Sequence, residues 1–260
     1  GLVSTLTVNG GETTASGFWM AAMQGFQTTL TARPLFTMNN GLLSTPVFYC
    51  GNTGGTPKPK IVINGGTLKV GPTDVMKLAN SPGCETELTL SGGTVFVTNQ
   101  PLSLAENYAG AKGTLNLDGG RLIAHNMTNG VNGAGLVYFN GGIFQPSASL
   151  TLSTVALTNR AGGAFFDVPQ GVAYTLARTI GHDASLGASP DGGLTKLGAG
   201  TLLLSAVQAY TGPTVLSNGT LTVTAPVTNA LSLAGLSLGG TVESDAQLTV
   251  TADRASFLAG

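Results

Sequence analysis

Residues 61–70 read IVINGGTLKV, two alternating stretches joined by an Asn-Gly-Gly triplet. Apolar residues occupy every second position on both sides of the glycines, which predicts two short strands with one face turned inward. Glycine adopts positive φ without a steric penalty, so the triplet predicts a sharp corner between the two strands.

The same phrase recurs along the chain, and its spacing decides between architectures. The clearest other copies read LTVNGG at 6–11, FTMNNGLL at 36–43, LTLSGGTVFV at 88–97, LNLDGGRLI at 115–123 and VYFNGGIF at 137–144. Their final glycines, with that of 61–70, stand at 11, 41, 66, 93, 120 and 142, so successive intervals are 30, 25, 27, 27 and 22 residues. A period in the twenties is typical of a solenoid, whereas a propeller blade needs about 40 residues.

The repeat therefore predicts an all-β fold, a β-solenoid of roughly nine to ten coils that forms a single domain over residues 1–260. The paired glycines should stack along one corner, beside a hydrogen-bonded ladder of Asn, Ser and Asp side chains. These glycines are Gly10, Gly11, Gly65, Gly66, Gly92, Gly93, Gly119, Gly120, Gly141 and Gly142. A series of β-hairpins is the alternative, because Asn-Gly also favours hairpin turns, but hairpins predict a shorter spacing.

Composition limits the classes of partner. Only 9% of the residues are charged, against about 25% in an average soluble protein, and the net charge is −1. This balance argues against electrostatic binding of nucleic acid or of a membrane surface. No apolar run approaches the roughly 18 residues of a membrane-spanning helix, so we expect no membrane insertion. The 39 glycines argue against a helical protein, because each costs about 1 kcal/mol inside a helix.

A family resemblance appears in the last third of the chain. The segments read LTKLGAGTLLLS at 194–205, YTGPTV at 210–215 and NGTL at 218–221. Together they resemble the autotransporter-associated β-strand repeat of bacterial secreted proteins, with Ala206 in place of a Gly and Gln208 in place of an Asn. The resemblance covers about 28 residues. It implies a right-handed parallel β-helix on a bacterial cell surface or in secreted material, and a scaffold role without catalysis.

Four segments interrupt the rhythm and are predicted as loop insertions, near 12–34, 51–60, 99–113 and 181–193. A short helix is predicted near residues 17–27, because Trp19, Met23 and Phe26 would share one helical face. Such a helix would cover the first coils or make a contact with a neighbouring subunit.

The two cysteines, Cys50 and Cys84, leave two alternatives open. They form one disulfide, as an extracellular location favours, or they remain free thiols. Neither belongs to a Cys-x-x-Cys pair, so the sequence predicts no metal site.

An enzyme is the less favoured interpretation. Right-handed β-helices include polysaccharide lyases and hydrolases, whose sites need clustered carboxylates. The Asp and Glu residues here are scattered, and Gly181-His182-Asp183 only faintly resembles the Gly-His-Gly of pectin hydrolases. We read His182 and His125 as loop or surface residues and expect no catalytic site and no cofactor.

The sequence thus predicts a non-enzymatic structural protein at the bacterial surface or outside the cell. Both ends look strand-like and uncapped, so the favoured hypothesis is a building block that associates head to tail with itself into filaments. The expected contact residues are Leu2, Val3, Leu6 and Val8 at one end and Leu248, Val250, Phe257 and Leu258 at the other. The alternative is a passenger or adhesin segment that binds a surface or a glycan.

Overall fold

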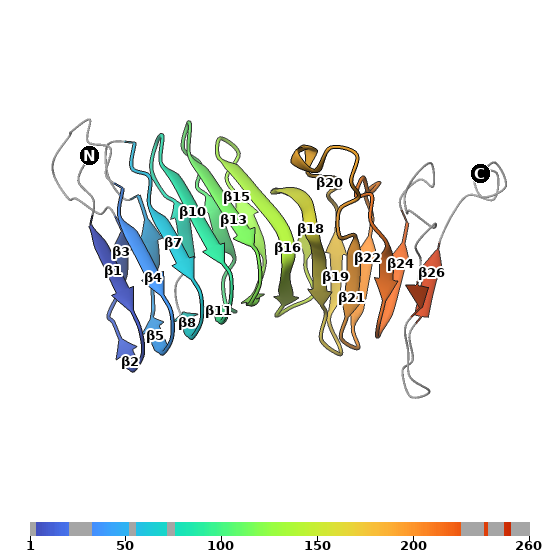
Figure 1. Ribbon diagram of the computed structural model, residues 1–260, viewed down its shortest axis with the longest axis horizontal. Coiled ribbons are helices and arrows are strands. Elements are labelled where there is room, and N and C mark those ends of the chain that lie inside the picture. The colour runs from blue at the N-terminus through green and yellow to red at the C-terminus, as the bar shows by residue number, and fades with distance from the viewer. Residues whose placement is uncertain are drawn as a thin grey trace.

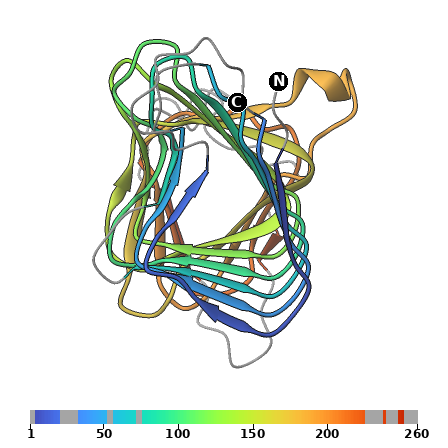
Figure 2. The ribbon, with the colours of Figure 1, turned by 90° about the vertical axis from the view of Figure 1, so that its left-hand side faces the viewer.

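The fold is a right-handed parallel β-helix with three faces. The computed structural model describes residues 4–20, 33–51, 56–71 and 76–224, with the backbone of 237–238 and 247–250. The coils stack side by side from the N-terminal to the C-terminal end (Figure 1). Seen along the axis in Figure 2, the first strand runs down the right-hand side, and the second runs leftwards along the bottom as the chain recedes, which is a right-handed turn.

In each coil the strand of the first face comes first, directly after the loop that connects it to the preceding coil. Its strands pair in parallel with the equivalent strands of the neighbouring coils. In order they are β1 (Thr5–Val8), β4 (Leu35–Met38), β7 (Lys60–Ile63), β10 (Glu85–Leu90), β13 (Lys112–Leu117), the first halves of β16 (Ala134–Pro146) and β18 (Ala156–Asp167), and β20 (Ile180–His182).

The second face follows the glycine corner and is also parallel throughout. Its strands are β2 (Glu12–Thr14), β5 (Leu42–Thr45), β8 (Thr67–Val70), β11 (Thr94–Val97), β14 (Arg121–Ala124), the second halves of β16 and β18, β21 (Leu194–Leu197), β23 (Thr214–Leu216) and β25 (Ser237–Leu238). Because β16 and β18 run through the corner, the first two faces form one continuous sheet.

The third face closes each coil and consists of two separate parallel ladders. The first ladder contains β3 (Phe18–Met20), β6 (Phe48–Cys50), β9 (Met76–Ala79), β12 (Leu102–Ala105) and β15 (Met127–Asn129). The second contains β17 (Thr151–Leu152), β19 (Ala173–Leu176), β22 (Thr201–Leu204), β24 (Thr220–Val223) and β26 (Gln247–Val250). Each coil contributes one strand to this face, so the two ladders correspond to ten coils in the part of the chain that the structure describes.

Alternate residues of the strands fill the interior. Leu68, Val95 and Leu122 occupy the same position on adjacent strands of the second face, and all three side chains are fully buried. The outward neighbours Lys69, Phe96 and Ile123 are only partly buried or exposed. Each coil thus adds one layer to a continuous apolar core, as the alternation in the repeat predicts.

The paired glycines lie at the corner between the first and second faces. Gly11, Gly41, Gly66, Gly93 and Gly120 all have positive φ, between 60° and 89°. A Cβ on Gly66 would lie 2.6 Å from the carbonyl oxygen of Gly41, and one on Gly93 would lie 2.5 Å from that of Gly66. In the fifth pair the positive φ belongs to Gly141 instead of Gly142, because β16 continues through the corner. Each corner backbone therefore packs directly on the one before it.

Beside the glycines, side-chain amides form part of a ladder. Asn39 Nδ2 donates to Asn9 Oδ1 over 2.8 Å, and Asn64 Nδ2 donates to Asn39 Oδ1 over 2.8 Å. Further along, Asn140 Nδ2 donates to Asp118 Oδ1 over 3.1 Å. These hydrogen bonds connect one coil to the next beside the corner, where the backbones of successive coils are in close contact.

The predicted helix near 17–27 is wrong where the structure describes it, because Phe18–Met20 form the strand β3. Phe18 stacks on Phe48 of the next coil with ring centroids 4.7 Å apart, while Trp19 is half exposed. The aromatic residues thus follow the two-residue period of a strand. Residues 21–27 lie outside the described residues.

Two of the predicted insertions contain regular strands. The segment 12–34 includes β2 and β3, and the segment 99–113 includes β12. The segment 181–193 contains a single 3-10 turn, Ala184–Leu186, which projects from the rod at the upper right of Figure 2. Residues 52–55 of the segment 51–60 lie outside the described residues. Within the described ranges, no helix is long and apolar enough to cross a membrane.

Replacing a corner glycine should destabilise the protein more where there is less free space around it. Gly66→Ala forces an L-residue into positive φ against the backbone of Gly41, and we expect a loss of about 1–3 kcal/mol in the free energy of unfolding. Gly10→Ala is the matched control, because Gly10 has open space around it and no positive φ. Urea unfolding of both variants checks this, and equal stabilities would contradict the role of the corner.

The core stack gives a second stability prediction. Leu122→Ala removes a fully buried side chain and leaves a cavity, so the free energy of unfolding should fall by about 2–5 kcal/mol. Ile123→Ala, one residue further on the outward side, should cost clearly less. Similar losses for the two variants in thermal or urea unfolding would mean that the inward and outward faces are assigned incorrectly.

Candidate functional site

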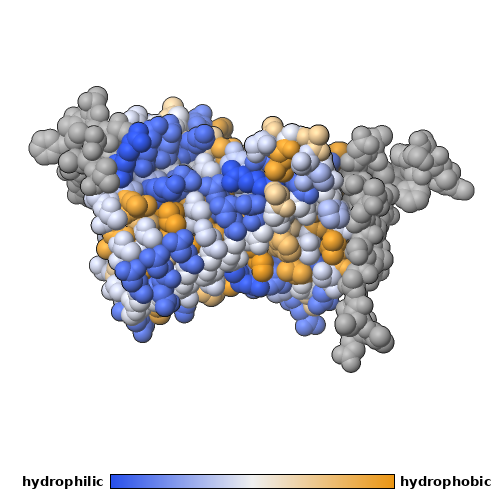
Figure 3. Space-filling view, in the orientation of Figure 1, coloured by the Kyte–Doolittle hydropathy of each residue, from blue (hydrophilic) through white to orange (hydrophobic). Residues whose placement is uncertain are grey.

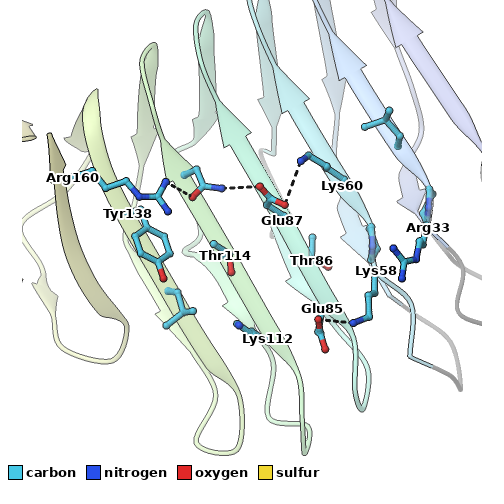
Figure 4. A pocket seen from close by; sticks show the side chains of 15 residues that line it. Arg33, Lys58, Lys60, Glu85, Thr86, Glu87, Lys112, Thr114, Tyr138 and Arg160 are labelled. Carbon is cyan, nitrogen blue, oxygen red and sulfur yellow. Dashed lines mark hydrogen bonds and ion pairs between the residues drawn. The ribbon is translucent and has the colours of Figure 1, made fainter. Parts of the chain in front are cut away.

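A groove of about 690 Å³ runs across the outer surface of the first face. Its floor consists mainly of outward residues from successive strands, seen from close by in Figure 4. The lining residues are Arg33, Pro34, Leu35, Lys58, Pro59, Lys60, Glu85, Thr86, Glu87, Lys112, Thr114, Asn116, Leu136, Tyr138 and Arg160. In Figure 3, which shows the molecule in the orientation of Figure 1, hydrophilic surface forms a band over these strands.

The ladder register brings these residues together from distant parts of the chain. Leu35, Lys60, Glu87, Thr114 and Leu136 are direct partners on β4, β7, β10, β13 and β16. Because neighbouring strands lie about 4.8 Å apart, this row of side chains extends along the axis of the rod. The groove is therefore parallel to the axis.

The groove gathers positive charge. It contains five of the eleven Lys and Arg residues of the chain but only two of the twelve Asp and Glu residues. The protein as a whole carries a net charge of −1, so the excess of cations is local to this surface. Such an arrangement creates a positive potential along a narrow strip of the molecule.

Both carboxylates of the groove are paired with lysines of the preceding coil. Lys58 Nζ lies 2.8 Å from Glu85 Oε2, and Lys60 Nζ lies 3.5 Å from Glu87 Oε2. The hydrogen bond from Lys58 lowers the pKa of the Glu85 carboxyl, which stays ionised. Within the described residues, no ion pair involves Lys112 or Arg33.

Arg160 organises the C-terminal end of the groove. Its guanidinium lies 4.0 Å from the centroid of the Tyr138 ring, and its Nη1 donates to Asn116 Oδ1 over 3.2 Å. Its Nε donates to Asp183 Oδ2 over 3.0 Å. Asn116 Nδ2 in turn donates to Glu87 Oε1 over 2.9 Å, so polar contacts run across four strands (Figure 4).

A second polar cluster holds the base of the projecting segment 181–193. Asp191 is buried and accepts hydrogen bonds from the backbone amides of Thr211, Gly212 and Gly193. His182 Nδ1 lies 2.9 Å from Asp191 Oδ2, and this hydrogen bond raises the pKa of the imidazole.

This cluster lacks the geometry of a Ser-His-Asp type triad. The hydroxyl of Thr211 lies 3.1 Å from His182 Nδ1, on the same nitrogen that faces Asp191. The other nitrogen, Nε2, lies 3.3 Å from the carbonyl oxygen of Gly187. Across the described ranges, no group of three or more His, Cys, Asp or Glu side chains is placed to hold a metal ion.

The two cysteines are close in space but are not bonded. Both thiols are buried, Cys50 in the main core and Cys84 in a small cluster with three alanines. Burial raises the pKa of both thiols. Both cysteines are free thiols in the structure, and a Cys50–Cys84 disulfide stays a prediction.

The residues expected to mediate assembly are only partly described. Leu6 lies in the inward row, paired with the buried Phe36, yet it is 48% exposed because no described strand covers the outer edge of β1. Val8 packs against the core. Leu248 and Val250 lie on β26 in register with β24. Leu2, Val3, Phe257 and Leu258 lie outside the described residues.

The segment that resembles a known repeat has polar residues inside the coil. Lys196 is fully buried, and its Nζ donates to the carbonyl oxygens of Leu197, of Gly198 over 2.7 Å and of Asn218 over 3.2 Å. The ammonium group thus closes two turns from within. Burial lowers the pKa of Lys196 to about 8.

Gln208 has a similar bracing role. Its side-chain oxygen accepts a hydrogen bond from the Ile180 amide over 2.9 Å, and its Nε2 donates to the carbonyl oxygen of Ala206 over 2.7 Å. The hydroxyl groups of Tyr210 and Thr214 lie 2.7 Å apart. Lys196 and Gln208 therefore satisfy backbone groups from inside the coil, while Tyr210 pairs with the side chain of Thr214.

Comparison with known proteins agrees with this geometry. The family described as passenger-associated-transport-repeat matches residues 194–223. No curated protein and no solved structure matches the chain. The repeat and the parallel β-helix together support an autotransporter passenger β-repeat protein, and this repeat suggests a surface or secreted location.

The buried Lys196 predicts a pH dependence. Its pKa is about 8 in the folded protein and about 10.5 when solvated, so between these values the unfolded chain binds more protons. The Lys196 contribution to stability should therefore rise as pH increases from about 8 towards 9.5, whereas the raised pKa of the buried Cys50 and Cys84 thiols acts in the opposite direction. Urea midpoints of wild type and Lys196→Met across this range measure the effect. The slope of stability against pH should be less positive in Lys196→Met than in wild type, and Lys69→Met should keep the wild-type slope; an unchanged slope in Lys196→Met would contradict the assignment.

Proposed function

We propose that the chain is a non-enzymatic segment of a passenger-type β-helix, presented at the bacterial surface or outside the cell, with the groove of the first face as its contact surface. The observation that carries the proposal is the combination of a passenger repeat at 194–223 with a charged groove built on rigid strands. Such strands hold side chains at fixed spacing, which suits the recognition of an extended ligand.

The chemistry of the groove favours binding over catalysis. Glu85 and Glu87 each pair with a lysine, and the lowered pKa of Glu85 keeps this carboxylate charged. A general acid needs a raised pKa and a general base needs a free carboxylate in reach of substrate. The paired charges instead present hydrogen-bond donors and acceptors at fixed positions, to which a ligand can bind.

Presentation at the surface can be tested directly. The full chain, fused upstream of an autotransporter translocator, should reach the outside of intact cells and become accessible to an added protease there. A periplasmic protein in the same cells serves as the control and should remain protected. Retention of the chain inside intact cells, with a competent translocator, would overturn the proposed role as a passenger segment.

End-to-end association is the second candidate, and the exposure of Leu6 favours it. The inward side chain of Leu6 is half exposed, and a further coil packed against β1 would bury it. A second copy of the chain would provide such a coil. Backbone pairing along β1 would then extend the ladder from copy to copy.

Sedimentation velocity at increasing protein concentration tests this association. Wild type should form larger species as concentration rises, and Leu6→Lys should remain monomeric because a charge would enter the contact. Thr7→Lys, on the outward side of the same strand, is the matched control and should associate like wild type. Monomeric wild type at every concentration would exclude the association.

A further inference from the structure

We infer that the groove binds a linear polysaccharide that bears carboxylate groups and lies along the axis of the β-helix. This inference rests on the proposed role of the groove as a contact surface and names the chemical class of its ligand. It draws on four features of the described residues: the direction of the groove, its available cations, its uncharged lining and its small aromatic content.

The direction of the groove favours a linear polymer. Its lining residues come from β4, β7, β10, β13, β16 and β18, six strands that follow one another along the axis. At about 4.8 Å per strand the groove extends over roughly 24 Å. A compact small molecule would use only a part of this length, whereas a chain of several sugar rings would fill it.

The cations of the groove remain available to an anionic ligand. Among the described residues, neither Lys112 nor Arg33 has a carboxylate within ion-pair distance, although the charges of both help to lower the pKa of the Glu85 carboxyl. Lys60 is half exposed, and its pair with Glu87 is long at 3.5 Å. Exposed ion pairs contribute about 0–1 kcal/mol, so a carboxylate of a ligand can compete for such a lysine. The lysines and arginines without a close ion pair are few and widely spaced, so they would pair with only some of the carboxylates along such a polymer.

The uncharged lining suits sugar rings. Thr114 and Tyr138 carry hydroxyl groups that make no hydrogen bond within the described residues, and both face the groove (Figure 4). Leu35 and Leu136 lie at the two ends of the same row and are partly exposed. Hydroxyl groups can bond to sugar hydroxyls, while the leucines can contact the apolar faces of the rings.

The aromatic content argues against a nucleic acid. Proteins that bind single strands stack the bases on exposed aromatic rings. Tyr138 is the one aromatic residue among the lining residues, and Arg160 already covers a face of its ring. The net charge of −1 also fails to supply the many phosphate contacts that nucleic-acid binding requires.

The contacts of Arg160 hold the side chains at the C-terminal end of the groove in place before a ligand binds. Hydrogen bonds to Asp183 and Asn116 fix the guanidinium, and the guanidinium in turn holds the Tyr138 ring. Because these side chains are already ordered, a ligand loses little additional conformational entropy on contacting them.

Binding of sodium polygalacturonate to the full chain tests the inference by isothermal titration calorimetry, with neutral dextran and single-stranded DNA of similar length as comparison ligands. The groove variant is Lys60→Gln with Lys112→Gln. The matched control is Lys69→Gln with Lys77→Gln, which changes the net charge equally but lies on the second and third faces. Thermal unfolding confirms that all proteins are folded.

We expect wild type to bind polygalacturonate and not dextran, with affinity that falls as salt rises. Oligouronates should bind more tightly with length until the groove is filled. The groove variant should bind about tenfold more weakly, and the control should stay within about twofold of wild type.

Three results would overturn the inference. Equal losses in the two double variants would show attraction by net charge alone, tighter binding of DNA would assign the groove to nucleic acid, and no binding of polygalacturonate would exclude this ligand class. None of these results affects protease accessibility on intact cells, so failure of the inference and failure of the proposed passenger role are distinguishable.

Discussion

The close contact between successive corner backbones sets the geometry of the whole molecule. At the turn between the first two faces, a Cβ on Gly41, Gly66 or Gly93 would lie 2.5–2.6 Å from the carbonyl oxygen of the corner before. Only glycine leaves enough room for coils to stack at strand spacing here, and its positive φ lets the chain turn within two residues. This contact fixes both the separation of the coils and their register.

The register then determines what each surface presents. In a strand, successive side chains point to opposite sides, so a fixed register keeps inward residues over inward residues and outward over outward. Leu68, Val95 and Leu122 consequently form a buried column. On the first face, the same rule aligns Lys60 with Glu87 and carries the groove along the rod. One backbone constraint thus produces both the core and the candidate site.

The region of the passenger repeat also turns at positive-φ glycines, Gly198 and Gly219, and adds buried polar side chains to its turns. Where the early coils use paired glycines and an amide ladder, this region buries Lys196 and Gln208 and directs their polar atoms at turn backbone. A buried ammonium group costs solvation, and three carbonyl acceptors offset that cost. The motif therefore includes a structural brace, and the groove that we propose as a contact surface lies elsewhere on the molecule.

The sequence by itself determined the solenoid, because the period of the glycine phrase and the two-residue alternation are local properties of the chain. It predicted a helix where Phe18–Met20 form a strand, since three aromatic and methionine positions also fit a helical face. It did not reveal the groove. Lys60, Glu87, Lys112 and Arg160 are separated by tens of residues, and only the parallel register places them on one face. Tertiary structure decided the site because its residues become neighbours through the stacking of coils.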